Sequence, residues 1–101
     1  MAYTIEKLYI IRTYHIDENN PEPSGTTDAI FIDLVSAIQA VDSNECDLCE
    51  DGFNQYVVIG EIETGMYPIV EEVLWFKWDN QDKYYKSCKR PEFATGFCYS
   101  L

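Results

Sequence analysis

The first residues of the chain show a pattern of apolar positions that is typical of an extended strand. The stretch YTIEKLYIIRTYHI, residues 3–16, is rich in β-branched and aromatic residues and predicts a long first strand. The next segment, DENNPEPSGTT at residues 17–27, contains Asn, Pro, Gly and Ser. Those residues favour turns, so the pattern predicts a loop there.

The stretch DAIFIDLVSAIQAVDS that follows has two interpretations. Its apolar residues fit a single helix that starts near Asp28. We favour a short strand through residues 29–32, followed by a helix that ends near Val41. In this interpretation Asp33 is the N-cap, because its carboxylate can accept a backbone N–H that the first helical turn leaves free.

The second half of the chain predicts three more strands. Residues 43–54 are polar and predict a turn, and QYVVIGEIET at 55–64 is a strand rich in β-branched residues. VEEVLWFKW at 70–78 and KYYKSCK at 83–89 predict two strands joined as a hairpin by DNQD. We therefore expect a single α+β domain over residues 1–101, with one helix packed on a mainly antiparallel sheet of about four to five strands.

Charge is distributed unevenly along the 101 residues, which carry a net charge of −11. With 47% hydrophobic and 15% aromatic residues, the composition is typical of a folded protein. No Lys or Arg occurs between Thr13 and Phe76, a segment of sixty-four residues with fourteen carboxylates. Solubility explains many acidic surfaces, but it does not require that cations be absent from so long a segment.

The absence of cations suggests a surface that binds a basic partner. Carboxylates that alternate along a strand recur at a spacing similar to that of successive phosphates in nucleic acid, and they can pair with Arg and Lys side chains. We expect non-catalytic binding to a basic nucleic-acid-binding groove of another protein. The candidate contacts are Asp42, Glu45, Asp47, Glu50, Asp51, Glu61, Glu63, Glu71 and Glu72.

The segment LWFKWDNQDKYYKSCKR interleaves aromatic residues with Lys and supports an alternative hypothesis. Single-stranded nucleic acid is bound by such residues, but the acidic remainder of the domain would repel it, so we expect no direct nucleic-acid binding. Leu74, Phe76 and Trp78 share one face of a strand and are expected in the core. Trp75 faces the other way, and as an exposed anchor it would make the 73–86 hairpin an interaction or assembly module, with a homodimer as one form.

In size, acidity and compact α+β layout, the chain resembles small phage-encoded inhibitors of host defence, the anti-CRISPR proteins and related DNA mimics. The segment without Lys or Arg, residues 13–76, carries this resemblance. The resemblance implies a non-catalytic inhibitor that blocks the nucleic-acid groove of a CRISPR effector or another host nuclease. Its location would then be the cytoplasm of the host cell.

The stretch SNECDLCEDGF contains two cysteines with the spacing of half a zinc site. A full site would need Cys46, Cys49, Cys88 and Cys98, but nine residues separate the second pair, unlike in ordinary zinc ribbons. A redox pair would need a lowered thiol pKa, which the surrounding carboxylates oppose. With no secretory signal and no apolar run of membrane-spanning length, we expect a cytoplasmic protein with reduced thiols and no cofactor.

No enzyme motif is recognisable in the sequence. A Gly-rich phosphate loop, a nucleophile elbow and an H-E-x-x-H motif are absent. His15 is the only histidine, and Glu61 and Glu63 would face the same side of a strand about 7 Å apart. Carboxylate pairs at that distance act in some glycosidases, but a solvated strand face has the same pattern. We therefore expect a protein that is not an enzyme.

Overall fold

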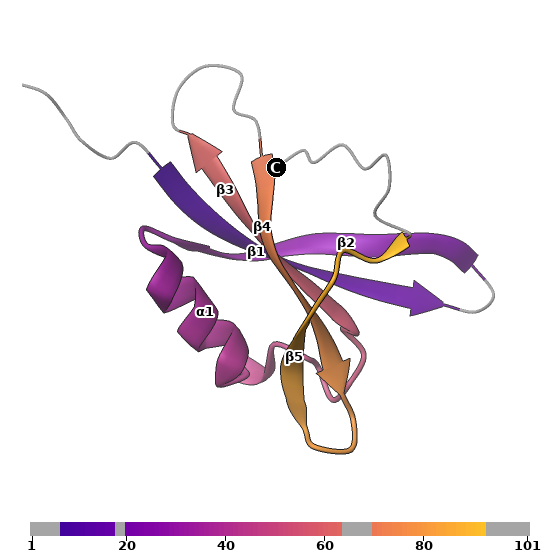
Figure 1. Cartoon of the computed structure of the whole chain (residues 1–101). Helices are drawn as coiled ribbons and strands as arrows, with labels where there is room; N and C mark the ends of the chain where they lie inside the picture. Colours follow the sequence, from indigo (N-terminus) through magenta and orange to yellow (C-terminus); the bar gives the residue numbers. More distant parts are fainter. Residues whose placement is uncertain (1–6, 18–19, 64–69, 93–101) are drawn as a thin grey trace, which may run out of the picture.

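Within the described residues, five antiparallel strands form one sheet, and one α-helix lies on one of its faces (Figure 1). The computed structural model describes residues 7–17, 20–63 and 70–92. The strand order is β2-β1-β3-β4-β5. The elements are β1 (Lys7–Asp17), β2 (Asn20–Phe31), α1 (Leu34–Asp42), the short 3-10 helix η1 (Glu45–Asp47), β3 (Tyr56–Glu63), β4 (Val70–Asp79) and β5 (Tyr84–Cys88). One helix and an antiparallel sheet agree with the expected α+β layout, although the sheet dominates.

β1 and β3 form the centre of the sheet because their apolar residues are consecutive. Ile10 and Ile11 on β1 and Val57, Val58 and Ile59 on β3 are almost completely buried. Neighbouring residues of a strand point to opposite faces, so both faces of this pair are covered. The two strands pair in one uninterrupted register over their shared length.

α1 begins as the sequence predicts, with Asp33 as its N-cap. One carboxylate oxygen of Asp33 accepts the backbone N–H of Ser36 at 2.8 Å, and the other accepts the Ser36 hydroxyl at 2.9 Å. These two bonds lower the pKa of the Asp33 carboxyl. The helix then buries Ala37, Ala40 and Val41 against the sheet. Two of these residues are small, which lets the helix approach the strands closely.

Both faces of β4 are packed. Leu74, Phe76 and Trp78 join the cluster under α1, as expected for core residues. Trp75 on the opposite face is only 4% exposed, so the prediction that it is an exposed anchor is wrong. Its indole stacks on the ring of Tyr14, with 5.8 Å between the ring centroids. Tyr14 lies on β1, two strands away, and its ring reaches across β3 to cover the tryptophan.

β2 replaces most of the loop that the sequence predicts at residues 17–27. The strand begins at Asn20 and pairs with β1 over almost its whole length. An edge strand tolerates the prolines at 21 and 23 wherever the missing N–H would face outward. Gly25 lies opposite Tyr14 and leaves room for its ring. Pairing with β1 therefore overrides the local preference for a turn.

Replacing Gly25 with alanine should destabilise the fold. A methyl group at this position would overlap the ring of Tyr14, which is held in its stack on Trp75. We expect a loss of about 1–3 kcal/mol in the free energy of unfolding, as for other overpacked sites. Urea denaturation followed by tryptophan fluorescence measures this loss. Ile30→Ala, an exposed position on the same strand, is the control and should change stability little. Equal or higher stability of Gly25→Ala would contradict this account, since alanine otherwise suits a strand better than glycine.

Candidate functional site

The turn that joins α1 to β3, residues 43–55, holds a cluster of carboxylates in an unusual backbone conformation. The non-glycine residues in it that have positive φ angles, between 47° and 58°, are Asn44, Cys46, Asp47, Glu50 and Asp51. Such a conformation costs roughly 1–2 kcal/mol for an ordinary residue, although Asn and Asp adopt it more easily. Hydrogen bonds and packing contacts must therefore stabilise this conformation of the turn.

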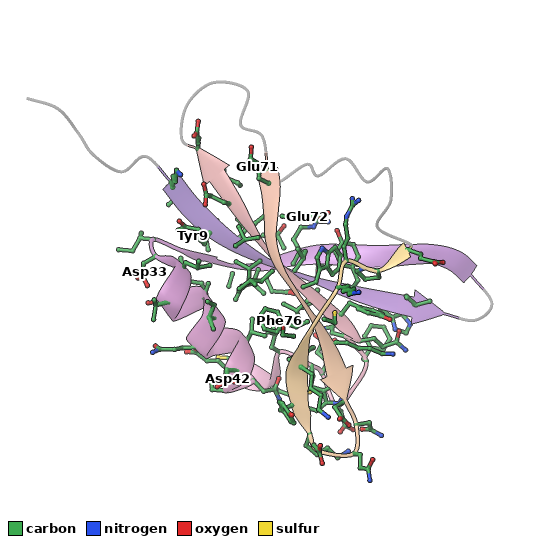
Figure 2. The ribbon with its side chains drawn as sticks, in the orientation of Figure 1. Tyr9, Asp33, Asp42, Glu71, Glu72 and Phe76 are labelled. Atoms are coloured by element: carbon green, nitrogen blue, oxygen red, sulfur yellow. The ribbon has the colours of Figure 1, made fainter. Side chains whose placement is uncertain are left out.

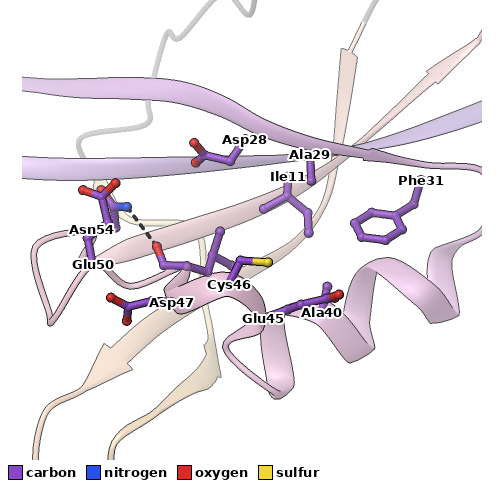
Figure 3. Close-up of a pocket in the computed structure, with 11 residues that line it drawn as sticks. Ile11, Asp28, Ala29, Phe31, Ala40, Glu45, Cys46, Asp47, Glu50 and Asn54 are labelled. Carbon is purple, nitrogen blue, oxygen red and sulfur yellow. Dashed lines mark hydrogen bonds between the residues drawn. The ribbon is translucent and has the colours of Figure 1, made fainter.

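Two asparagines provide contacts within the turn. The side-chain oxygen of Asn44 accepts the backbone N–H of Cys49 at 2.8 Å. The side-chain nitrogen of Asn54 donates to the carbonyl oxygen of Leu48 at 2.9 Å (Figure 3). Cys49 and Asn54 are both buried. The two amides thus satisfy backbone groups that the helix and the sheet do not reach.

Two residues from the sheet fasten the turn from outside. The hydroxyl of Tyr85 on β5 donates to the backbone carbonyl of Asn54 at 2.6 Å. Burial raises the pKa of this hydroxyl well above its usual value, so it remains a donor. On β1, the ring of His15 stacks on Phe53 with 3.7 Å between centroids, and its Nδ1 lies 3.0 Å from the Phe53 carbonyl oxygen. His15 therefore positions the turn.

A cleft of about 350 Å³ lies between this turn, α1 and the strands β1 and β2 (Figure 3). Its apolar lining consists of Ile11, Ala29, Phe31, Ala40 and Leu48. Its carboxylates are Asp28, Glu45, Asp47 and Glu50. The volume is within the range of about 300–1,000 Å³ typical of ligand pockets. Apolar walls and several carboxylates together suit a group with an aliphatic stem and a cationic end.

The charged side chains of the cleft are all negative, since no Lys or Arg is among the described residues that line it. Asp28 lies on β2, across the cleft from Asp47 on the turn (Figure 3). The Asp28 carboxylate accepts hydrogen bonds from the hydroxyls of Thr13 and Thr26, which orient it. Glu45, Asp47 and Glu50 are exposed and do not form ion pairs in the part of the chain that the structure describes. The described ion pairs therefore do not neutralise these three carboxylates, and the carboxylates can attract a cation from outside the protein.

Some of the predicted contact residues reach this cleft. Glu45, Asp47 and Glu50 line it, while Asp42 and Asp51 are exposed in the adjoining segment. Asp28 also lines the cleft, although it was not among the predicted contact residues. It lies where the register between β1 and β2 shifts, and this shift was not predictable from local spacing.

The remaining predicted contacts lie elsewhere. Figure 2 shows Glu71 and Glu72 near the start of β4, far from Asp42 at the end of α1. Glu61 pairs with Lys7 at 2.9 Å, and Glu71 is its cross-strand neighbour. Glu63 is exposed at the end of β3.

Glu72 lies on the face of the sheet opposite α1, where Trp75 packs. Its carboxylate accepts the indole N–H of Trp75 at 2.9 Å and pairs with Arg90 at 2.7 Å. A single acidic face that includes all the predicted carboxylates is therefore not present.

Cations gather on the face of the sheet opposite α1. The three cation–π contacts of the described residues lie there, with 5.4–5.8 Å between each cation and the ring centroid. The pairs are Arg12 with Tyr14, Lys77 with Tyr56, and Lys86 with Tyr84. The sheet thus separates the acidic cleft from these three cations.

The three cysteines among the described residues do not come together as a zinc site would require. Cys49 is buried in the cluster under α1, whereas Cys88 packs on the opposite face of the sheet, where burial raises its thiol pKa. Cys46 is exposed, and Cys98 lies outside the described residues. Within residues 7–17, 20–63 and 70–92, no three His, Cys, Asp or Glu side chains are grouped so that they could hold a metal ion.

No protein family, curated protein or solved structure matches the chain. Among the described residues, none of the helices has the length and apolar character needed to cross a membrane. The chemistry of the cleft is thus the basis for a functional proposal.

Removing the hydroxyl of Tyr85 should loosen the acidic turn. Tyr85→Phe leaves the buried carbonyl of Asn54 without its donor, which typically costs about 1–3 kcal/mol. We expect this loss in urea denaturation, together with faster amide hydrogen exchange in residues 43–55. Tyr84→Phe is the matched control, because the neighbouring tyrosine is exposed. Unchanged stability and exchange in Tyr85→Phe would show that the turn does not depend on this bond.

Proposed function

We propose that the protein is a non-catalytic binder whose acidic cleft and adjoining turn bind a basic, nucleic-acid-binding surface of another protein. The observation that carries this proposal is the cleft between β2 and the turn, where four carboxylates and several apolar side chains line the walls and none of the described lining residues is a cation. An Arg side chain of the partner fits this chemistry. Its methylene stem would contact the apolar side chains, and its guanidinium would pair with the carboxylates, with bidentate geometry available.

The distribution of charge supports the same proposal. The exposed carboxylates of the turn add long-range attraction to the contacts inside the cleft, and such attraction speeds the encounter of two proteins. The cations of β4 and β5 lie on the opposite face and would not compete for these carboxylates. Association through this surface should therefore weaken as salt screens the charges.

The proposed partner is a CRISPR effector or another host nuclease, and the proposed mechanism is occlusion of its nucleic-acid groove. The acidic character of the cleft and the size of the domain support this class of partner, which presents Arg and Lys side chains to phosphates. The protein would then act in the cytoplasm of the host cell, by binding in a fixed ratio and without turnover.

The β4–β5 hairpin is the second candidate surface. Tyr84 and Val73 are exposed there, whereas Trp75 is buried. An assembly module that uses this apolar surface would bind its partner with little dependence on salt, which distinguishes it from the acidic cleft.

Neutralising two cleft carboxylates should weaken binding to a basic probe. The variant Glu45→Gln/Glu50→Gln is compared with Asp82→Asn/Glu92→Gln, which makes the same change in net charge at exposed positions away from the cleft. With a fluorescein-labelled oligo-arginine peptide, we expect the cleft variant to lose roughly tenfold in affinity, equivalent to about 1.4 kcal/mol. The measurement is fluorescence anisotropy at low and at physiological salt.

The control variant separates the cleft from general acidity. If both double variants lose affinity equally, net charge alone determines binding, and the cleft has no special part in it. Affinity that is insensitive to salt in the unmodified protein would favour the hairpin surface instead.

A further inference from the structure

One buried polar side chain of the cleft has an oxygen that no described residue bonds. Asn54 lines the cleft although it is only 9% exposed. Its backbone N–H donates to Cys49, its backbone carbonyl accepts the Tyr85 hydroxyl, and its side-chain nitrogen donates to Leu48. The side-chain oxygen receives no hydrogen bond from the described residues, and protein atoms do not seal it off. It is therefore open to a donor in the cleft.

The cleft thus offers acceptors for hydrogen bonds and ion pairs. The four carboxylates and the oxygen of Asn54 are all acceptors, and none of the described lining residues is a cation. A ligand that fits must supply the donors. An ammonium group has only donors and carries the complementary charge, so it suits these oxygens better than any anion does.

The acceptors are spread along the cleft. Figure 3 shows Glu50 beside Asn54 at one end of the cleft. At the other end, Glu45 lies beside Ala40 of α1. Among the described residues, no three His, Cys, Asp or Glu side chains are close enough together to hold a metal ion. A compact cation therefore cannot contact three of the carboxylates at once, whereas an elongated one can reach both ends.

Apolar side chains line the rest of the cleft. Ala29, Phe31 and Leu48 are only partly buried in the cluster under α1, so they keep apolar surface that a ligand can cover. A chain of methylene groups removes such surface from water when it binds. The pattern of acceptor, apolar wall and acceptor matches a molecule with ammonium groups at both ends of an aliphatic chain.

We propose that the cleft binds a linear aliphatic diamine or polyamine. One ammonium group pairs with Glu50 and the oxygen of Asn54, the methylene chain lies on the apolar wall, and a second ammonium group pairs with Glu45. The cleft volume of about 350 Å³ is in the range of small-molecule sites. This inference goes beyond the proposed function, because the ligand is a free small molecule and its binding needs no protein partner.

Isothermal titration calorimetry with unbranched diamines of increasing chain length tests the fit. Two acceptor groups at a fixed separation should give the highest affinity at one chain length, with a dissociation constant on the order of 0.1–1 mM. Two matched probes separate the contributions. A monoamine with the same chain lacks the second charge, and Mg²⁺ has the same charge without the chain. Each should bind roughly tenfold more weakly than the best diamine.

Variants locate the binding to the cleft. Glu45→Gln/Glu50→Gln should reduce the affinity for the best diamine about tenfold, whereas Asp82→Asn/Glu92→Gln, with the same change in net charge, should reduce it little. Glu45→Gln alone should weaken the diamine more than the monoamine, because a single ammonium group can still bind at the Glu50 end. Amide chemical shifts should change mainly at residues 28–31 and 45–54.

The controls define the results that would overturn the proposal. Affinity that only rises or only falls with chain length, Mg²⁺ that binds as tightly as the diamines, or equal losses in both double variants would each refute it. If oligo-arginine binds and no diamine does, the proposed function stands and this inference fails. If a diamine binds and oligo-arginine does not, the inference stands without the proposed function. If both bind, the diamine must displace the labelled peptide, and failure to do so would place the diamine outside the cleft.

Discussion

The pairing of β1 with β3 is the interaction on which the rest of the structure depends. Because these strands carry apolar residues on both faces, each face of the sheet must be covered. On one side α1 supplies the cover, and on the other the stack of Tyr14 on Trp75 does so. The chain must then return from the end of α1 to the start of β3 within a short turn. That return places the carboxylates of residues 43–55 beside β1 and β2 and forms the cleft.

The sheet also separates charges that are already separated in the sequence. The acidic middle of the chain supplies β2, α1 and the turn, while the cations of the last quarter belong to β4, β5, the turn between them and the residues after them. Glu72 is an exception, because a hydrogen bond from Trp75 and an ion pair with Arg90 hold it among the cations. Concentrating like charges costs stability through self-repulsion, and the buried centre of the sheet offsets that cost.

Local signals in the sequence predicted the elements that depend on local chemistry. Asp33 was identifiable as an N-cap because its hydrogen bonds are local. Their donors belong to Ser36, three residues further along the same turn. β3 and the β4–β5 hairpin followed from consecutive β-branched residues and a polar turn. Only the end of β2 was predicted, as a short strand at 29–32, because the first half of β2 resembles a loop and only pairing with β1 makes it a strand. The burial of Trp75 and the place of Asp28 in the cleft likewise depend on partners distant in sequence.

The conformation of the acidic turn distinguishes it from an ordinary solvated acidic loop. A flexible loop would lose conformational entropy when its carboxylates are fixed on a partner, and this loss weakens binding. Here the left-handed residues are already held by Asn44, Asn54 and the hydroxyl of Tyr85. Folding therefore supplies most of the ordering before any partner arrives. Carboxylates on a fixed backbone can match the spacing of cations on a rigid surface, and that match, beyond net charge, is what would make the cleft selective.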